Sequence, residues 1–283
     1  MKSAYLAIIL AFGLACCGQS GADKAATAAE QAHLIAETAE LGDAAWLEAR
    51  ELAQKAVEQD AGQKKAMAGI IGRSFVLGPD HESRAGDAET YLIDGLELDP
   101  KLHWLLAKGY ENGWYGEIDK PRACGHFLES AMEAKLNGAY WPLALCYLNG
   151  TGVEANAETA FEWMDKSANA GDQNGMVSLA VLYATGQGTE KNLNMAATWY
   201  ETAIHAKGPN RAQAMRGLGA MHLFELPDGV QQRGYALLEL AKREGDPVAA
   251  RLLTKVSALD ETQRKAVDVQ KEFLTNFYKL SEG

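Results

Sequence analysis

The chain has 283 residues, of which 47% are hydrophobic and 23% are charged, a composition that excludes a predominantly disordered protein. Its 27 basic and 38 acidic residues give a formal net charge of −11. No basic cluster or stripe of basic and aromatic residues occurs, which argues against nucleic acid as a partner. We interpret the acidic balance mainly as solvation of the surface.

The first residues have the pattern of a secretory signal. Lys2 is followed by an uncharged, mostly apolar run over 4–15, and then by Cys16 and Cys17. The run is shorter than the ~20 residues of a membrane-spanning helix, so we interpret residues 1–16 as a signal peptide. It resembles a bacterial lipoprotein signal, which implies a lipid on Cys16, with Cys17 as the alternative. The other interpretation is a plain cleaved signal and a soluble periplasmic protein.

The next stretch predicts an N-terminal helical cap. Residues 22–42 are rich in alanine, and residues 43–60 place Trp46 and Ala53 at helical spacing. We interpret the two segments as a helical hairpin. As domain bounds, we predict a flexible linker over 17–28 and the cap over 29–66.

From residue 67 to 256 the same side chains return at steps of 35 to 39 residues, which predicts about five structural repeats. Each repeat has a ring, an aliphatic residue four positions before it and a small residue three positions before it. The rings are Phe75, Tyr110, Tyr147, Tyr183 and His222. The aliphatic residues are Ile71, Leu106, Leu143, Leu179 and Leu218, and the small ones are Gly72, Ala107, Ala144, Ala180 and Gly219.

This spacing predicts two antiparallel helices in each repeat, which we call helix A and helix B. A glycine three residues after the ring, at 78, 113, 150 and 186, is typical of the end of helix A. Asp119, Asn156 and Asn192 are predicted N-caps of helix B. Asp99-Pro100 and Asp246-Pro247 predict an N-cap followed by proline at the first position of the next helix A.

The last segment, 257–283, predicts a C-terminal capping helix. Asp260 precedes Gln263 by three residues, which is typical of a helix N-terminus, and the amphipathic pattern continues to about residue 280. A single repeat is too small to bury its own apolar face, so the repeats must stack and their ends must be capped.

Two segments carry a resemblance to a known family. Residues 179–188, Leu-Ala-Val-Leu-Tyr-Ala-Thr-Gly-Gln-Gly, and residues 196–200 resemble helix A and helix B of the Sel1-like repeat, a relative of the tetratricopeptide repeat. Residues 143–163 match almost as well. The resemblance implies an all-α, right-handed α-solenoid of stacked antiparallel helix pairs, but it says little about activity.

No catalytic, metal or cofactor motif occurs. No two of the six histidines have the spacing of a helical metal site, and neither Gly-x-Ser-x-Gly nor Ser-x-x-Lys is present. We therefore predict no catalytic residue, no bound metal and no cofactor. Cys124 and Cys146 fall on adjacent predicted helices, with an axial offset near the limit for a disulfide, so the sequence leaves their pairing open.

The surface of helix A is the predicted binding site, because helix A usually lines the concave side of such a solenoid. Trp104, Trp141 and Arg216 follow one line along it, and Lys108 lies on a second line. These residues would suit an apolar peptide or a partner's helix. The alternative is that the tryptophans only seal the contacts between repeats. Trp114 and Tyr115, in a predicted loop, form a second candidate patch.

Together these features predict a non-catalytic lipoprotein that binds another protein or peptide through the concave surface. The resemblance and the signal imply the bacterial cell envelope, with the chain held in the outer membrane by its lipid and facing the periplasm. Three alternatives remain: a cell-envelope enzyme such as a β-lactamase-like hydrolase, an immunity protein against a secreted toxin, and a purely structural role.

Overall fold

The computed structural model describes residues 20–40, 43–79, 85–225, 231–255 and 259–280. Regular structure in these ranges is helical throughout, without a strand, which confirms the predicted all-α class. Cys16 and Cys17 lie outside the described residues. None of the described helices is long and apolar enough to cross a membrane.

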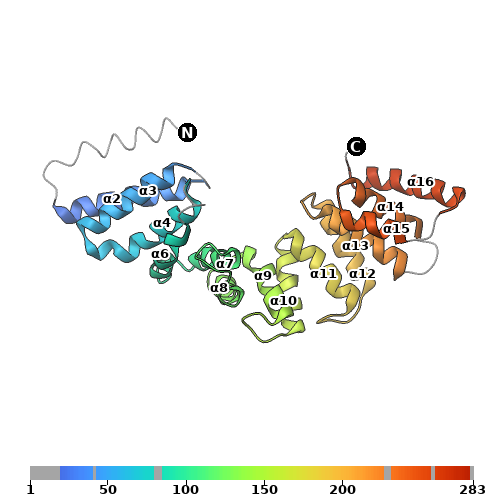
Figure 1. The fold of residues 1–283 in the computed structure, drawn as a ribbon, viewed down its shortest axis with the longest axis horizontal. Coiled ribbons are helices and arrows are strands. Elements are labelled where there is room, and N and C mark those ends of the chain that lie inside the picture. The colour runs from blue at the N-terminus through green and yellow to red at the C-terminus, as the bar shows by residue number, and fades with distance from the viewer. Residues whose placement is uncertain (1–19, 41–42, 80–84, 226–230, 256–258, 281–283) are drawn as a thin grey trace. The chain divides into compact units, whose positions relative to one another are not determined.

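The chain divides into two compact units, residues 1–136 and 137–283. The described helices of the first unit are α2 (Gly21–Thr38), α3 (Ala45–Gln59), α4 (Lys64–Leu77), α6 (Ala88–Gly95), α7 (Leu102–Asn112) and α8 (Lys120–Met132), with short 3-10 turns η1 (Ala61–Gln63) and η2 (Ala85–Asp87). They pack as consecutive pairs, α2 on α3, α4 on α6 and α7 on α8 (Figure 1).

The second unit continues the same pattern. Its described elements are η3 (Asn137–Ala139), α9 (Tyr140–Asn149), α10 (Ala157–Asn169), α11 (Gln173–Thr185), α12 (Leu193–His205), α13 (Arg211–Phe224), α14 (Gln231–Arg243), α15 (Pro247–Lys255) and α16 (Glu261–Phe277). Each pair also packs on the next, α10 on α11 and α12 on α13, and α14 contacts both α15 and α16. The stacking of helix pairs is therefore confirmed.

The repeated residues are buried or cap helices, as their spacing predicts. The five aliphatic residues of helix A are between 0% and 3% exposed. Asp119, Asn156 and Asn192 each accept the backbone N–H three residues ahead and so cap α8, α10 and α12. The predicted capping box of α16, between Asp260 and Gln263, is also present.

Three of the four predicted glycine stops are left-handed. Gly113, Gly150 and Gly186 end α7, α9 and α11 with φ of 72°, 65° and 75°, a conformation that other residues rarely adopt. Gly78 ends α4 in an extended conformation instead, with φ of −75°. The first repeat therefore leaves its helix A by a different path from the next three.

The predicted flexible linker over 17–28 is wrong from residue 20 onward. Ser20 and Asp23 form a reciprocal capping box, and α2 runs from Gly21 through the rest of the predicted linker. Ala25 and Ala28 are 0% and 5% exposed, because α2 packs on α3 along its alanine face. The helix predicted from the alanine-rich stretch is thus the interpretation that the structure supports, and its small side chains allow this close packing.

One of the two Asp-Pro predictions is also wrong. Asp246 caps α15 as predicted, since its Oδ1 accepts the N–H groups of Val248 and Ala249 at 2.8 Å. At the other site α7 begins only at Leu102, with Lys101 as its N-cap residue. Asp99 there accepts the N–H of Lys101 at 3.0 Å, so Pro100 lies in the turn before the helix.

Helices α4 and α6 approach each other closely at Gly95. A Cβ added to Gly95 would lie 2.7 Å from Leu102 Cδ1 and 2.9 Å from the backbone nitrogen of Gly69. A backbone atom at that distance cannot move aside without shifting a helix. Gly125, on the exposed face of α8, would instead meet nothing within 4 Å.

We predict opposite effects of alanine at these two glycines. Gly95→Ala should lower the free energy of unfolding by about 1–3 kcal/mol, since it overpacks the α4–α6 contact. Gly125→Ala should raise it by about 0.5–1 kcal/mol, since alanine loses less backbone entropy in a helix. Urea unfolding followed by circular dichroism measures both. Equal effects of the two substitutions would contradict the proposed close approach.

Candidate functional site

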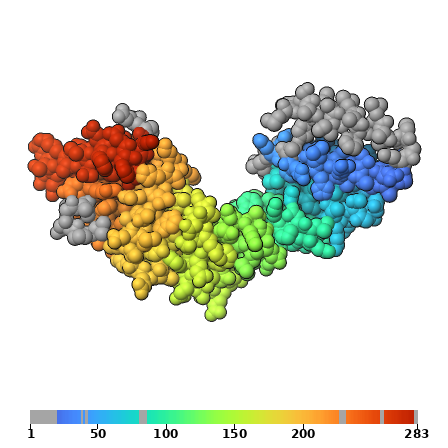
Figure 2. Space-filling model, turned by 180° about the vertical axis from the view of Figure 1, so that it is seen from behind, coloured from blue at the N-terminus to red at the C-terminus, as the bar shows by residue number. Residues whose placement is uncertain are grey.

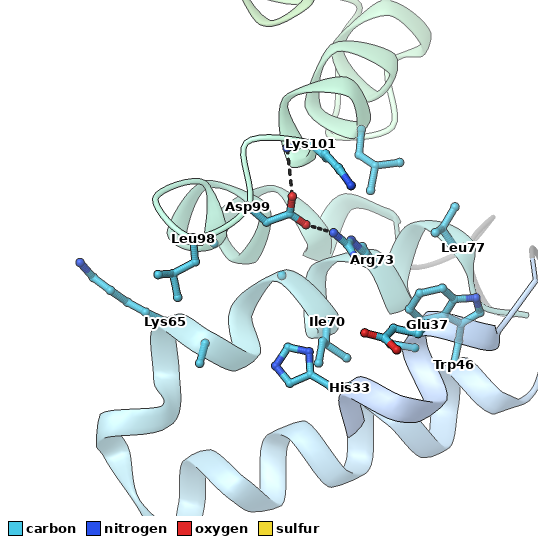
Figure 3. Close-up of a pocket in the computed structure, with 15 residues that line it drawn as sticks. His33, Glu37, Trp46, Lys65, Ile70, Arg73, Leu77, Leu98, Asp99 and Lys101 are labelled. Carbon is cyan, nitrogen blue, oxygen red and sulfur yellow. Dashed lines mark hydrogen bonds and ion pairs between the residues drawn. The ribbon is translucent and has the colours of Figure 1, made fainter. Parts of the chain in front are cut away.

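The first unit contains a groove of about 760 Å³ between α2, α4 and the turn that joins α6 to α7 (Figure 3). Its floor is apolar: Trp46, Ile70 and Leu105 line it and are 3%, 3% and 7% exposed. The indole N–H of Trp46 donates to the carbonyl of Glu40 at 2.9 Å, which fixes the ring. The floor is therefore formed before any ligand arrives.

An ion pair closes one side of the groove. Arg73 of α4 pairs with Asp99 in the turn before α7, and both side chains are 30% exposed (Figure 3). Burial lowers the pKa of Arg73. The pair holds the turn against α4, so it fixes the distance between two walls of the groove.

The rim carries charges of both signs. His33 and Glu37 approach from α2, Lys65 from the start of α4, and Lys101 from the turn before α7 (Figure 3). Lys65 pairs with Glu97 on the surface, and this carboxylate raises the pKa of Lys65. Beside them Leu98 is 60% exposed. An apolar floor with a mixed polar rim matches the surfaces that bind amphipathic peptides.

Two groove residues of the first repeat occupy the same repeat positions as the candidate binding residues Trp104 and Lys108 of the second repeat. Gly69 lies six residues before the ring Phe75, as Trp104 does before Tyr110, and Arg73 lies two before it, as Lys108 does. Helix A of the first repeat thus lines the groove through the predicted columns. Extending each column one step toward the N-terminus would have identified both residues.

Trp104 and Lys108 are both half-buried on α7. Lys108 forms an ion pair with Glu111, one turn further along the helix. Leu105, next to Trp104, contributes to the groove floor. These two predicted residues therefore lie on the same helix as part of the groove, without lining it themselves.

Trp141 and Arg216 belong to the second unit, where both connect successive repeats. The indole N–H of Trp141 on α9 donates to Ser178 Oγ on α11 at 3.1 Å. Arg216 Nε on α13 donates to Asp246 Oδ2 at 2.9 Å, just before α15. Val177, between them in the column, is 4% exposed. At Trp141 the structure supports the alternative interpretation, in which the ring seals a contact between repeats.

The second candidate patch is only partly open. Tyr115 donates its hydroxyl to the carbonyl of Leu105 at 3.1 Å and meets the ring of Tyr110 edge-on, with centroids 5.3 Å apart. Burial raises the pKa of Tyr115. Gly109 makes room for it, because a Cβ there would lie 2.0 Å from the tyrosine ring. Trp114 beside it is half-buried.

Two histidines form a pair that the sequence spacing did not indicate. His103 Nδ1 on α7 and His126 Nδ1 on α8 are 2.8 Å apart, and the ring of His126 stacks on Tyr110. Burial is the main cause that lowers the pKa of both, for His126 to about 4. They are 23 positions apart, so only the antiparallel packing of α7 and α8 joins them. Within the described residues, no three His, Cys, Asp or Glu side chains form a group that could hold a metal.

Cys124 and Cys146 are each 5% exposed. Cys124 lies on α8 in the first unit and Cys146 on α9 in the second. Cys146 shares its repeat column with Leu182 and Met221, which are 3% and 4% exposed. Cys146 is therefore buried in the core, as its repeat position predicts.

Comparisons with known proteins identify the repeats. The model of the Sel1 repeat matches residues 139–172, 174–207 and 212–246. The chain is similar in structure to a Sel1 repeat protein from Oxalobacter formigenes, with a TM-score of 0.54 and 20% identity over 72% of this chain and 84% of that one. A comparison with curated proteins found no match.

A second solved structure is a protective antigen present in uropathogenic Escherichia coli strains, which displays an SLR fold. It matches with a TM-score of 0.61 and 19% identity, over 89% of this chain and 54% of that one. The chain thus spans about half the length of the antigen. At these identities both likenesses concern the fold alone.

We predict that replacing His222, in the ring column of the fifth repeat, reduces the sensitivity of the protein to acid. Burial, with the charge of Arg233 as a smaller cause, lowers the pKa of His222 to about 4 from an ordinary value of 6.5. Its Nδ1 is buried without a hydrogen-bond partner among the described residues. The unfolded chain therefore binds this proton first, and stability falls as the pH drops from about 6.5 to about 4.

His222→Phe should remove a share of that loss on the order of 1–2 kcal/mol, a value reduced for the partial exposure of the ring. Unfolding temperatures of the wild type and the variant, measured at pH 7 and pH 4.5, test this. The same loss in both proteins would contradict the prediction.

Proposed function

We propose that this chain, which is a Sel1-repeat protein, binds another protein through the groove between α2, α4 and the turn before α7. Sel1-type repeat folds typically mediate protein–protein interaction and generally serve as non-catalytic scaffolds. The observation that carries the proposal is the buried apolar floor of Trp46, Ile70 and Leu105 beneath a rim of mixed charge.

The dimensions and the construction of the groove support a peptide ligand. Its volume of about 760 Å³ lies within the range of preformed binding sites in proteins. Its lining comes from five helices and one turn, and the ion pair between Arg73 and Asp99 holds the turn in place. A ligand therefore meets a rigid surface, which lowers the entropy cost of binding.

We also propose that this protein belongs to the bacterial cell envelope. We propose that residues 1–16 direct export, and that a lipid on Cys16, or alternatively Cys17, anchors the chain in the outer membrane with its repeats facing the periplasm. The apolar run over 4–15 followed by two cysteines supports this. In that setting the protein acts as an adaptor or regulator that holds a partner near the membrane.

Removing the lipid-bearing cysteine should release the protein from the membrane. We expect Cys16→Ser to move the chain from the membrane fraction to the soluble fraction, with Cys17→Ser having little effect. Fractionation and the mass of the intact protein measure this, because the lipid adds its own mass. A wild-type chain that is soluble and unmodified would contradict the anchor, and release by Cys17→Ser alone would assign the lipid to Cys17.

A pair of matched substitutions tests the groove. Leu98→Asp places a charge beside the apolar floor and should weaken partner binding about tenfold or more, as expected for an anchor position. Ile118→Asp is the control, because Ile118 is 61% exposed, like Leu98 at 60%, and does not line the groove. Capture from the native membrane fraction with each variant should lose one partner with Leu98→Asp only.

Equal recovery of every captured protein with both variants would contradict binding at this groove. Circular dichroism of both variants serves as the folding control. Because both side chains are mostly exposed, neither substitution should change the helix content.

A further inference from the structure

The second unit contains a separate cleft of about 600 Å³ between α14 and α16, with residues from α15 and the segment before α16. The two helices run antiparallel. Lys271 of α16 contacts Glu239 of α14 at 2.8 Å, and Tyr278, further along, lies near Arg233, which is earlier in α14. The end of α14 therefore lies beside the beginning of α16. In Figure 2 the red surface of α16 lies against the orange surface of α14 and α15.

This cleft is basic, although the chain as a whole carries a net charge of −11. Four basic and two acidic side chains line it, namely Lys242, Arg243, Arg264, Lys271, Glu239 and Asp268. Lys271 contacts both acids, at 2.8 and 2.9 Å, and the hydrogen bonds to them, with their charges as a smaller cause, raise its pKa. The two carboxylates are therefore already neutralised in part from within the cleft.

Three cations remain for a ligand. Lys242 and Arg243 at the end of α14, and Arg264 in the first turns of α16, are all exposed. None of the three forms an ion pair with another residue in the described part of the chain, at a limit of 4.0 Å between nitrogen and oxygen. The antiparallel packing brings the three to the same end of the cleft.

Local helix stability accounts for two of these cations but not for the third. Lys242 and Arg243 occupy the last turn of α14, where the helix dipole favours positive charge. Arg264 lies four residues after the N-cap Asp260, toward the end of α16 where the dipole disfavours a cation. Its position is thus better explained by what it faces across the cleft.

The same cleft offers apolar contacts. Leu253 of α15 and Leu259 are half-buried along it, Val267 lies beneath at 1% exposure, and Tyr235 lines it from α14. A flat basic patch would suit an anionic membrane, whereas cations on the walls of a cleft with an apolar base suit a side chain flanked by carboxylates. The overall negative charge of the chain also opposes adsorption to an anionic membrane.

We propose that this cleft binds an acidic segment of a partner polypeptide. Carboxylates of that segment face Lys242, Arg243 and Arg264, and an apolar side chain between them rests against Leu253 and Leu259. The proposal does not depend on the groove of the first unit. The net negative charge of the rest of the chain repels an acidic segment, so the charges favour binding in the cleft over binding elsewhere on the surface.

A labelled peptide rich in glutamate with a central leucine is the probe, and fluorescence anisotropy with the full mature chain is the measurement. Binding should weaken as salt is added, since the attraction is between partly exposed charges. A peptide with glutamine in place of each glutamate should not bind. Arg264→Glu should weaken binding about five- to tenfold, since it replaces an attraction by a repulsion.

Lys265→Glu is the matched control. It makes the same charge change one residue further along α16, at a side chain that is 76% exposed and does not line the cleft. Leu98→Asp, in the other unit, should leave peptide binding unchanged, so a failure of the groove proposal and a failure of this one are distinguishable.

Three results would overturn the proposal. They are no binding of the glutamate peptide, equal binding of the glutamine peptide, and equal losses with Arg264→Glu and Lys265→Glu. Preferential binding to vesicles of anionic phospholipid, with no binding of the peptide, would assign the cleft to a membrane surface instead.

Discussion

Every helix pair in this protein depends on how closely its two helices can approach. One aliphatic side chain of helix A is almost fully buried in each repeat, and a small residue follows it directly. In the first and fifth repeats that residue is glycine. A Cβ at Gly72 would lie 2.8 Å from Leu92, and one at Gly219 would lie 3.0 Å from the carbonyl of Gly234. The middle repeats carry alanine there, so their helices leave room for a methyl group.

This packing uses one face of helix A and leaves another free. The positions two and six residues before the ring are not part of this column, and their contacts differ from one repeat to the next. Six residues before the ring, Gly69 lines a groove, whereas at Trp141 and Arg216 the side chains in this position reach the next repeat. The same column can therefore hold the stack together in one repeat and present a surface in another.

The features that were predictable from the sequence are local or periodic. Helix caps such as Asn156 depend on residues three positions away, and the buried columns repeat with each unit, so one chain contains several copies of the same evidence. The alanine-rich stretch predicted the N-terminal hairpin, but the point where its first helix begins was harder to predict, since a few alanines are also compatible with a linker. Only the capping box at Ser20 and Asp23 marked the start of the helix in the sequence.

The features that were not predictable are contacts between side chains on different elements of the structure. Examples are the pair His103 and His126 and the pair Arg73 and Asp99. The two residues of each pair are too far apart in the sequence to lie on neighbouring turns of one helix. The cations at 242, 243 and 264 are likewise scattered in the sequence and gather only because α14 and α16 run antiparallel. Binding surfaces of a repeat protein arise in this way, from positions that the repeat itself leaves free to vary.

The different exit of the chain after α4 bears on how such an array can grow. Gly113, Gly150 and Gly186 turn the chain in the left-handed conformation, whereas Gly78 does not. A duplicated copy of residues 174–207 would carry a compatible surface on each side and could be inserted beside the original. The first repeat lacks this left-handed glycine, and its α4 already packs against α3 of the N-terminal hairpin. Gene duplication can thus lengthen the array from its regular repeats, while the first repeat stays a single copy that is specialised for its contact with the N-terminal hairpin.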